Sequence, residues 1–322
     1  MINLRFGRMT KLSRTIVSIA LGLSFVVGFA RVTSAPILET TTFSTRIVDS
    51  KDKLLRLTLS GDEKYRLFTA IDEVPPSVVD AILMHEDRYF RYHPGLNPLS
   101  LIRAFMTTYV EGSRRMGGST ITMQLARMTS TRGSKTISGK FHQIGRALWL
   151  EATHSKDEIL EAYLNLLPYG GNVEGLGAAS LVYFSKEVKD LTLPEVLGLA
   201  IVPQNPNERG QGTQSGSFTA AREKLFEEWV SRHPEDQSLA VAMRLPLDFK
   251  ATKTLPFHAP HFTGVVLDRS RSRSKLESSK LVTTLDHDLQ RRLEAKIKTY
   301  VKEKSRLGIV NAAALIVDTT SM

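Results

Sequence analysis

The sequence contains no cysteine among its 322 residues. Disulfide bonds and thiolate metal sites are therefore excluded, although a chain of this length can bury an ample core without them. A glycine-rich phosphate loop is also missing, because Gly117-Gly118 lacks the spacing of nucleotide-binding motifs. No nucleotide cofactor is expected, and the substrate is not expected to be activated by a nucleotide.

Acidic residues are outnumbered: 33 Asp and Glu face 43 Lys and Arg, which gives a formal net charge of +10. This excess favours an anionic partner, such as a nucleic acid, anionic lipid headgroups or a pyrophosphate-linked substrate. Nucleic acid has the least support, because the basic residues are not interleaved with stacking aromatic residues.

An uncharged apolar run extends from Thr15 to Ala30 behind a basic segment at residues 1–14. Together with residues up to 35 it predicts a single membrane-spanning helix with the N-terminus in the cytoplasm and the bulk of the chain outside. The alternative is a cleaved signal peptide, since residues 33–35 are small. Pro36 directly after that position disfavours cleavage and favours the anchor.

Chemically reactive side chains are concentrated in the segment Glu86–Gly95, at the end of a predicted helix. Val79, Ile82 and Leu83 share a helical face with Glu86, so this carboxylate lies on the apolar side. Burial there would raise its pKa toward the range that a general acid or base needs. A lone Glu near a helix end is more commonly a solvated charge or a cap.

Gly117–Arg127 is the second unusual segment. Its glycines lead into a predicted helix, and Ser119, Thr120 and Thr122 place hydroxyl groups at the start of that helix. Free backbone N–H groups at a helix N-terminus favour an anion. An ordinary Ser or Thr N-cap explains the same pattern without any ligand.

Two helix starts carry predicted capping boxes. Ser77 with Asp80 would open the helix that leads to Glu86, and Ser155 with Glu158 would open a helix that reaches residue 167.

The pair of segments is more specific than either alone. E-D-x-x-F-x-x-H-x-G followed by G-G-S-T-I-T-x-Q-L-A resembles the peptidoglycan glycosyltransferase domain of class A penicillin-binding proteins (family 51 glycosyltransferases), over about residues 75–229. Later landmarks agree: Lys156–Asn165, Gly175–Ala179 and Tyr183–Lys186. The Gln143–Glu151 run and the Pro168–Gly171 turn resemble the 1C subgroup most. The resemblance implies a mostly α, lysozyme-like glycosyltransferase domain.

The domain organisation that we expect has five parts: a basic cytoplasmic tail at 1–14, an anchor at 15–35, a β-hairpin connector at 36–74, the glycosyltransferase domain at 75–245, and a linker with an incomplete start of the transpeptidase domain at 246–322. A penicillin-reactive site needs a Ser-x-x-Lys nucleophile with partner motifs. Ser272–Lys275 fits that pattern, but it lies in a basic linker predicted at 268–280 and no partner motif follows it. No transpeptidase activity is therefore expected of this chain.

The resemblance implies that Glu86 is the general base and that cations stabilise a departing pyrophosphate. Most of the family has a second catalytic Glu at the position of Gln143, and an amide can act there only by hydrogen bonding. The family's lysine that closes the second motif is Arg127 here. The remaining substrate-binding candidates are Asp87, Phe90, His93, Arg103, Ser119, Thr120, Gln124, Lys140, Arg146 and Asn165.

The implied substrates are lipid II and the growing lipid-linked glycan chain, at the bacterial inner membrane, together with other cell-wall synthesis proteins as partners. A divalent cation (Mg or Mn) would be bound through the substrate's pyrophosphate, since the sequence offers no dedicated protein cage for it. Two alternatives remain open: a lysozyme-like glycan-cleaving enzyme, which would also use a Glu in a helical lobe, and a non-catalytic membrane-anchored protein. For His93 there is an alternative to substrate binding: it would form a local hydrogen bond that holds its own loop in place.

Overall fold

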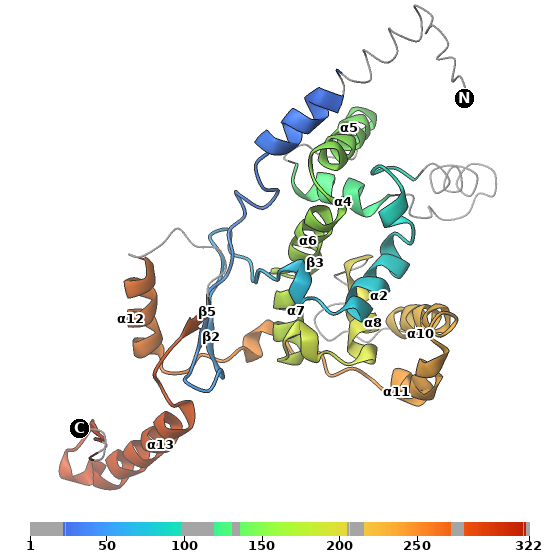
Figure 1. Cartoon of the computed structure of the whole chain (residues 1–322). Coiled ribbons are helices and arrows are strands. Elements are labelled where there is room, and N and C mark those ends of the chain that lie inside the picture. Colours follow the sequence, from blue (N-terminus) through green and yellow to red (C-terminus); the bar gives the residue numbers. More distant parts are fainter. Residues whose placement is uncertain are drawn as a thin grey trace, which may run out of the picture. The chain divides into compact units, whose positions relative to one another are not determined.

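The computed structural model describes residues 22, 24–97, 119–130, 136–204, 206, 216–271, 280–317 and 319. These residues are mostly helical, as the sequence predicts (Figure 1). They divide into two compact units: Met1–Thr41 with Thr69–Phe249, and Thr42–Phe68 with Lys250–Met322. Glu86 and the second motif both belong to the first unit.

The first unit is a helical assembly with one short hairpin. Its helices are α2 (Pro76–Glu86), α4 (Ile121–Met128), α5 (Ile137–Thr153), α6 (Lys156–Leu166), α7 (Leu176–Phe184), α8 (Leu193–Ile201), α10 (Gly216–Val230) and α11 (Ala240–Arg244). The hairpin is formed by β3 (Pro168–Gly170) and β4 (Val173–Glu174), and short 3-10 turns include η1 (Ile71–Glu73), η2 (Phe90–Tyr92) and η4 (Val202–Gln204).

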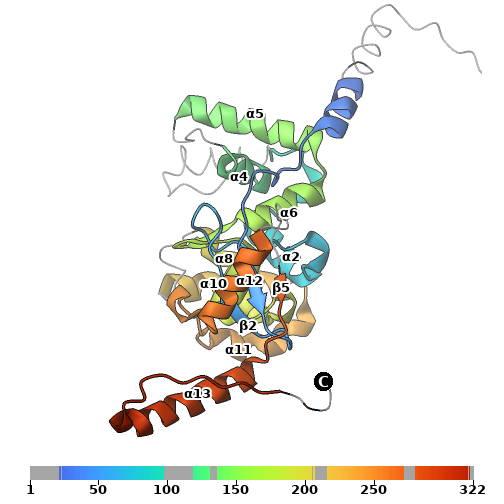
Figure 2. The ribbon, with the colours of Figure 1, turned by 90° about the vertical axis from the view of Figure 1, so that its left-hand side faces the viewer.

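α4 is the central helix around which the site is built. It packs against both α5 and α6, and Figure 2 shows α5 lying across the top of this group. Ile121, Met123, Leu125 and Ala126 of α4 are fully buried. Elsewhere in the unit, α2 packs on α8, and α8 packs on α10. These six helices of the first unit thus fix the positions of the two sequence motifs.

The helix starts test the predicted capping boxes. The box at Ser155 and Glu158 is confirmed, with both of its reciprocal hydrogen bonds present. The box at Ser77 is wrong: α2 begins at Pro76, and its N-cap Pro75 makes no side-chain cap bond. Proline is well suited to the first helical position because its fixed φ is already helical and its missing N–H would be unbonded there.

The second unit contains the predicted hairpin and one strand that sequence reasoning did not assign to it. β1 (Arg46–Val48) pairs antiparallel with β2 (Leu54–Leu57), and β5 (Lys280–Val282) adds to the other side of β1 in parallel. α12 (Pro260–Arg271) replaces the start of the predicted linker. α13 (His287–Lys304) starts at His287, because Asp286 caps it by accepting from the N–H groups of Asp288 and Leu289.

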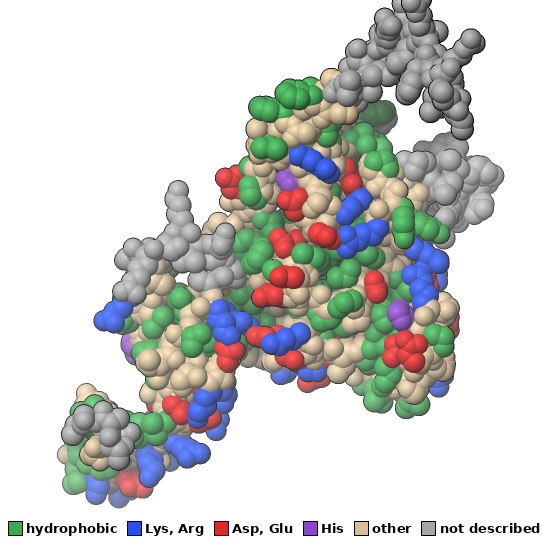
Figure 3. Space-filling model, in the orientation of Figure 1, with side chains coloured by type: hydrophobic (Ala, Val, Ile, Leu, Met, Phe, Trp, Pro, Cys, Tyr) green, Lys and Arg blue, Asp and Glu red, His purple; other side chains and the backbone are tan. Residues whose placement is uncertain are grey.

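Several expectations fall wholly or partly outside the described residues. Arg103 and the Ser272–Lys275 pattern are among them. Of the predicted anchor, the structure describes a helix at residues 24–33 with exposed apolar side chains (Figure 3). Among the helices that the structure describes, none combines the length and apolarity needed to cross a membrane.

Candidate active site

Glu86 is the last residue of α2 and faces α4. Gln124 Nε2 donates a hydrogen bond of 2.8 Å to Glu86 Oε2. The other oxygen, Oε1, is shielded from solvent and has no hydrogen-bond partner among the described residues. The buried side of α2 is centred on Val78, Ala81 and Ile82, so Glu86 lies at the margin of the apolar face and is half-buried.

The pKa of Glu86 is raised above its ordinary value, chiefly because burial disfavours the carboxylate. The hydrogen bond from Gln124 opposes this shift, while the negative charge of Asp87 adds to it. Arg127 and the side chain of Gln204 oppose it as well. The result is a carboxyl group that binds a proton more readily than an exposed glutamate does, which suits a proton acceptor.

Two buried tyrosines contribute to the apolar surroundings of Glu86. Tyr163 and Tyr169 are fully buried, and neither hydroxyl has a hydrogen-bond partner in the part of the chain that the structure describes. Burial raises the pKa of both phenols, and the nearby Glu86 raises it further. Both side chains therefore remain neutral and keep the local dielectric constant low around the carboxyl group.

The N-terminus of α4 binds an anion, but that anion is the chain's own Asp87. The backbone N–H of Ile121 donates to Asp87 Oδ2 at 3.0 Å, and the N–H of Met123 donates to the hydroxyl of Thr120 at 3.2 Å. His93 Nε2 lies 3.0 Å from each oxygen of Asp87 and must donate, because a carboxylate only accepts. Two of the N–H groups at this helix start are therefore occupied by side chains of the chain itself.

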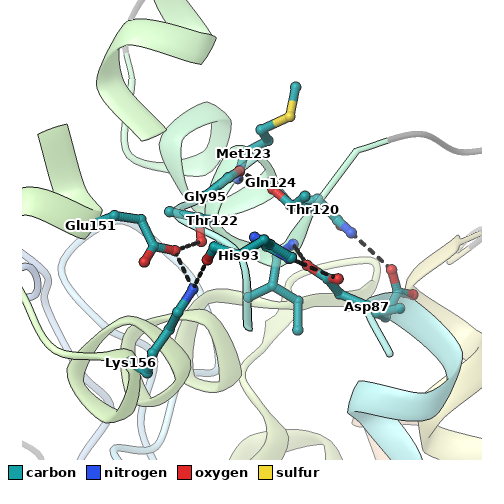
Figure 4. Close-up of polar contacts among 11 residues, drawn as sticks. Asp87, His93, Gly95, Thr120, Thr122, Met123, Gln124, Glu151 and Lys156 are labelled. Carbon is teal, nitrogen blue, oxygen red and sulfur yellow. Dashed lines mark hydrogen bonds and ion pairs between the residues drawn. The ribbon is translucent and has the colours of Figure 1, made fainter. Parts of the chain in front are cut away.

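A second polar network lies beside the first (Figure 4). Lys156 Nζ donates to Glu151 Oε1 at 2.7 Å and to the backbone oxygen of His93 at 2.6 Å. Thr122 donates its hydroxyl proton to the same Glu151 oxygen. Figure 4 shows these residues converging from α4, α5 and α6. The network holds the first motif against the second.

Gly95 closes the first motif where backbone and side chains crowd together. Its φ of +83° is unfavourable for other residues, and a Cβ would lie 2.8 Å from Cγ of Glu151. The hydroxyl of Thr120 donates to the Gly95 oxygen at 2.6 Å. Glycine is required at this position by both conformation and space.

The basic side of the site is formed by α4 and α5. Lys140 Nζ lies 3.1 Å from Gln143 Oε1 and 3.4 Å from Ser119 Oγ. Burial and the positive charge of Arg127 lower the pKa of Lys140. Within the described residues, neither Arg127 nor Lys140 forms an ion pair. The two side chains thus carry positive charge without an ion-pair partner in the described part of the chain, although Arg127 still attracts the Glu86 carboxylate.

The predicted substrate-binding residues separate into two groups. The first group is buried and stabilises the protein from inside; it consists of Asp87, Phe90, His93, Thr120 and Asn165. The second group is partly or fully exposed and consists of Ser119, Gln124, Arg127, Lys140 and Arg146. Arg103 lies outside the described residues.

Asn165 and Phe90 illustrate why the buried group does not fit substrate contact. Asn165 is 0% exposed, and its amide exchanges two 2.8 Å hydrogen bonds with the backbone of Thr69. Phe90 is also 0% exposed, with the ammonium of Lys156 at 4.4 Å from its ring centre. Substrate binding by these two residues is therefore corrected to a structural role.

The sequence alone assigns no role to Glu151, Lys156 or Gln204, and it places the Thr122 hydroxyl at a helix start without its partner Glu151. Thr122 and Glu151 lie 29 positions apart, and their pairing depends on the packing of α4 against α5. Gln204 approaches Glu86 from η4, far along the chain. No local sequence signal indicates these contacts.

Comparisons with known proteins agree with this architecture. A protein-family model described as Transglycosylase matches residues 51–229. Penicillin-binding protein 1C of Escherichia coli is 37% identical over 263 residues, which is 81% of this chain and 33% of that protein. Penicillin-binding protein 1F of Bacillus subtilis is 38% identical over 172 residues, covering 50% of this chain and 24% of that protein.

A crystal structure of penicillin-binding protein 1A from Haemophilus influenzae aligns with this chain at a TM-score of 0.37 and 18% identity. The alignment covers 87% of this chain and 33% of that one, and its TM-score is too low to assign a fold. The chain spans a third or less of the length of these relatives. The family match alone covers more than half of the 322 residues. The chain therefore belongs to the transglycosylase family found in penicillin-binding proteins 1A, 1C and 1F.

Proposed function

We propose that this chain is a peptidoglycan glycosyltransferase that polymerises lipid II into glycan strands. The observation that carries the proposal is the half-buried Glu86, whose pKa is raised, together with Arg127 and Lys140, two cations that lack an ion-pair partner among the described residues. A proton acceptor combined with two such cations suits transfer of a sugar from a pyrophosphate donor. The family match agrees with this chemistry.

In the proposed reaction, the 4-hydroxyl of the acceptor sugar attacks the anomeric carbon of the lipid-linked chain. Glu86 takes the hydroxyl proton as the new C–O bond forms. The bond between the anomeric carbon and the lipid pyrophosphate breaks, and the anomeric configuration inverts. Pyrophosphate leaves as an anion, so electrostatic stabilisation by Arg127 and Lys140 matters more than protonation of the leaving group.

The membrane is part of the proposal, because both substrates are lipid-linked. We assign residues 15–35 as a single-pass anchor in the bacterial inner membrane, with the catalytic domain outside the cytoplasm. The exposed apolar side chains of Phe25, Val26, Phe29 and Val32 support that assignment. Other cell-wall synthesis proteins are the expected partners, and the helical lobe is expected to be lysozyme-like.

The test is to incubate the purified chain with labelled lipid II and, separately, with intact peptidoglycan sacculi. The proposal predicts polymer from lipid II, inhibition by the phosphoglycolipid moenomycin, and no soluble fragments from sacculi. Fragment release without polymer would instead support a glycan-cleaving enzyme. No product from either substrate would support a non-catalytic membrane protein.

A further inference from the structure

Gln143 lies three residues after Lys140 on α5 and has a fixed orientation. Its side chain is 5% exposed, and Nε2 donates a hydrogen bond of 2.6 Å to the backbone oxygen of Met123. Because the amide nitrogen faces that carbonyl, the amide oxygen must face Lys140, and it accepts from Nζ at 3.1 Å. A carboxylate could not donate to Met123, so its lone pairs would oppose those of the carbonyl oxygen. The surrounding backbone is therefore built for an amide at this position.

The neutral amide of Gln143 accepts a hydrogen bond from Lys140 but does not neutralise its positive charge. Two of the three N–H donors of Lys140 are directed at Gln143 and Ser119, which leaves one for a ligand oxygen. Arg127 adds a second positive charge close enough to lower the pKa of Lys140. A diphosphate diester carries two negative charges, so these two side chains match it without any further cation.

The same donor set fits a divalent metal poorly. Mg²⁺ and Mn²⁺ prefer carboxylate and other oxygen ligands. Of the two carboxylates that open the first motif, Asp87 is bonded to His93 and to the N–H of Ile121, and Glu86 accepts from Gln124. No group of three or more His, Asp or Glu residues suited to a metal occurs in the described parts of the chain. Arg127 and Lys140 would also repel a cation placed between them.

We infer that Arg127 and Lys140 take the place of a divalent cation at the diphosphate. Gln143 is the positioning residue: it orients Lys140 without neutralising its positive charge. The inference rests on the proposed function and makes it more specific, because it departs from the metal that the family resemblance implies. Replacing Gln143 by Glu should then create a need for metal that the natural chain does not have.

The test measures binding of inorganic pyrophosphate to the full chain by calorimetry, with EDTA or with Mg²⁺. The natural chain is expected to bind in EDTA. Gln143→Glu should bind about tenfold more weakly in EDTA, because one charge-assisted hydrogen bond is lost, and Mg²⁺ should restore part of the affinity. Gly145→Glu is the matched control, since it adds the same charge to α5 at a site with nothing within 4 Å, and it should bind like the natural chain.

Binding by the natural chain only in Mg²⁺, or equal binding by Gln143→Glu in EDTA, would overturn the inference. Should Gln143→Glu fail to fold, Gln143→Leu replaces it. This variant should bind pyrophosphate in EDTA more weakly than the natural chain does, and Mg²⁺ should not change its affinity. Binding that depends on Mg²⁺ would contradict the inference. Polymerisation of lipid II in EDTA and in Mg²⁺ separates the two proposals. Polymer only in Mg²⁺ refutes metal independence but keeps the function, whereas no polymer in either refutes the function.

Discussion

Gln124 Nε2 donates a 2.8 Å hydrogen bond to Oε2 of Glu86, although the two residues lie 38 positions apart in the sequence. This bond joins the first sequence motif to the second at the carboxyl group that we assign as the proton acceptor. It also opposes the burial that raises the pKa of Glu86. One side chain of the second motif therefore adjusts the proton affinity of a carboxyl group in the first motif.

Replacing Gln124 by Leu should raise the pKa of Glu86 further, because a hydrogen bond to its charged form is lost. A general base acts in its deprotonated form, so kcat/KM for lipid II should rise with pH and the midpoint of that rise should move to higher pH. The measurement is the pH profile of polymerisation for both proteins. A profile with an unchanged midpoint and a uniformly lower rate would show that Gln124 is only structural.

Glu86→Gln should make the folded chain more stable at neutral pH. The folded-state pKa of Glu86 lies above its ordinary value of 4.5, so ionisation of this residue destabilises the folded state as pH rises through that range. An amide removes this cost. Thermal unfolding should show a higher Tm for the variant at pH 7, and the difference should vanish below about pH 4.5, where the acid is protonated in both states. A lower Tm at pH 7 would contradict the burial argument.

Gly95→Ala should destabilise the first unit by roughly 1–3 kcal/mol, because its φ is +83° and the new Cβ would lie 2.8 Å from Glu151. Gly145→Ala provides the comparison: it lies within α5 with open space around it, and should stabilise the helix by about 0.5–1 kcal/mol. Denaturant unfolding of both variants measures the difference. Equal effects would show that the crowding at Gly95 relaxes without cost.

Lys156→Met should lower the free energy of unfolding by roughly 1–3 kcal/mol, since it removes the ammonium partner of the largely buried Glu151 and a donor to the backbone of His93. Lys189→Met, which breaks the exposed pair with Glu187, should change the unfolding free energy by less than about 1 kcal/mol. A comparable loss in both variants would mean that the Glu151 network does not hold the motifs together.

The sequence predicted the features that depend on local pattern. The capping box at Ser155 is visible because its partner is three residues away, and the position of Glu86 on α2 follows from helical periodicity. The occupant of the α4 N-terminus was not predictable in this way. Asp87 reaches Ile121 across 34 positions, and only the packed structure shows that the chain supplies its own anion there.

Long-range pairing explains the other differences. The parallel addition of β5 to β1 joins residues 46–48 to residues 280–282, a separation that no local pattern encodes. The burial of Asn165 is similar: its hydrogen bonds to Thr69 span 96 positions, so an amide predicted to bind substrate proves to brace the fold. The sequence shows which residues belong to the two motifs. Only the tertiary structure shows which of them are buried and support the fold and which are accessible at the site.

The most direct measurement of the central claim is the initial rate of glycan polymer formation from lipid II by Glu86→Gln, compared with Glu227→Gln on the exposed side of α10. Loss of a general base predicts a rate at least about 100-fold below that of the natural chain for Glu86→Gln, with an unchanged rate for the Glu227 control. An undiminished rate of polymer formation by a folded Glu86→Gln protein would contradict the assignment of Glu86 as the proton acceptor.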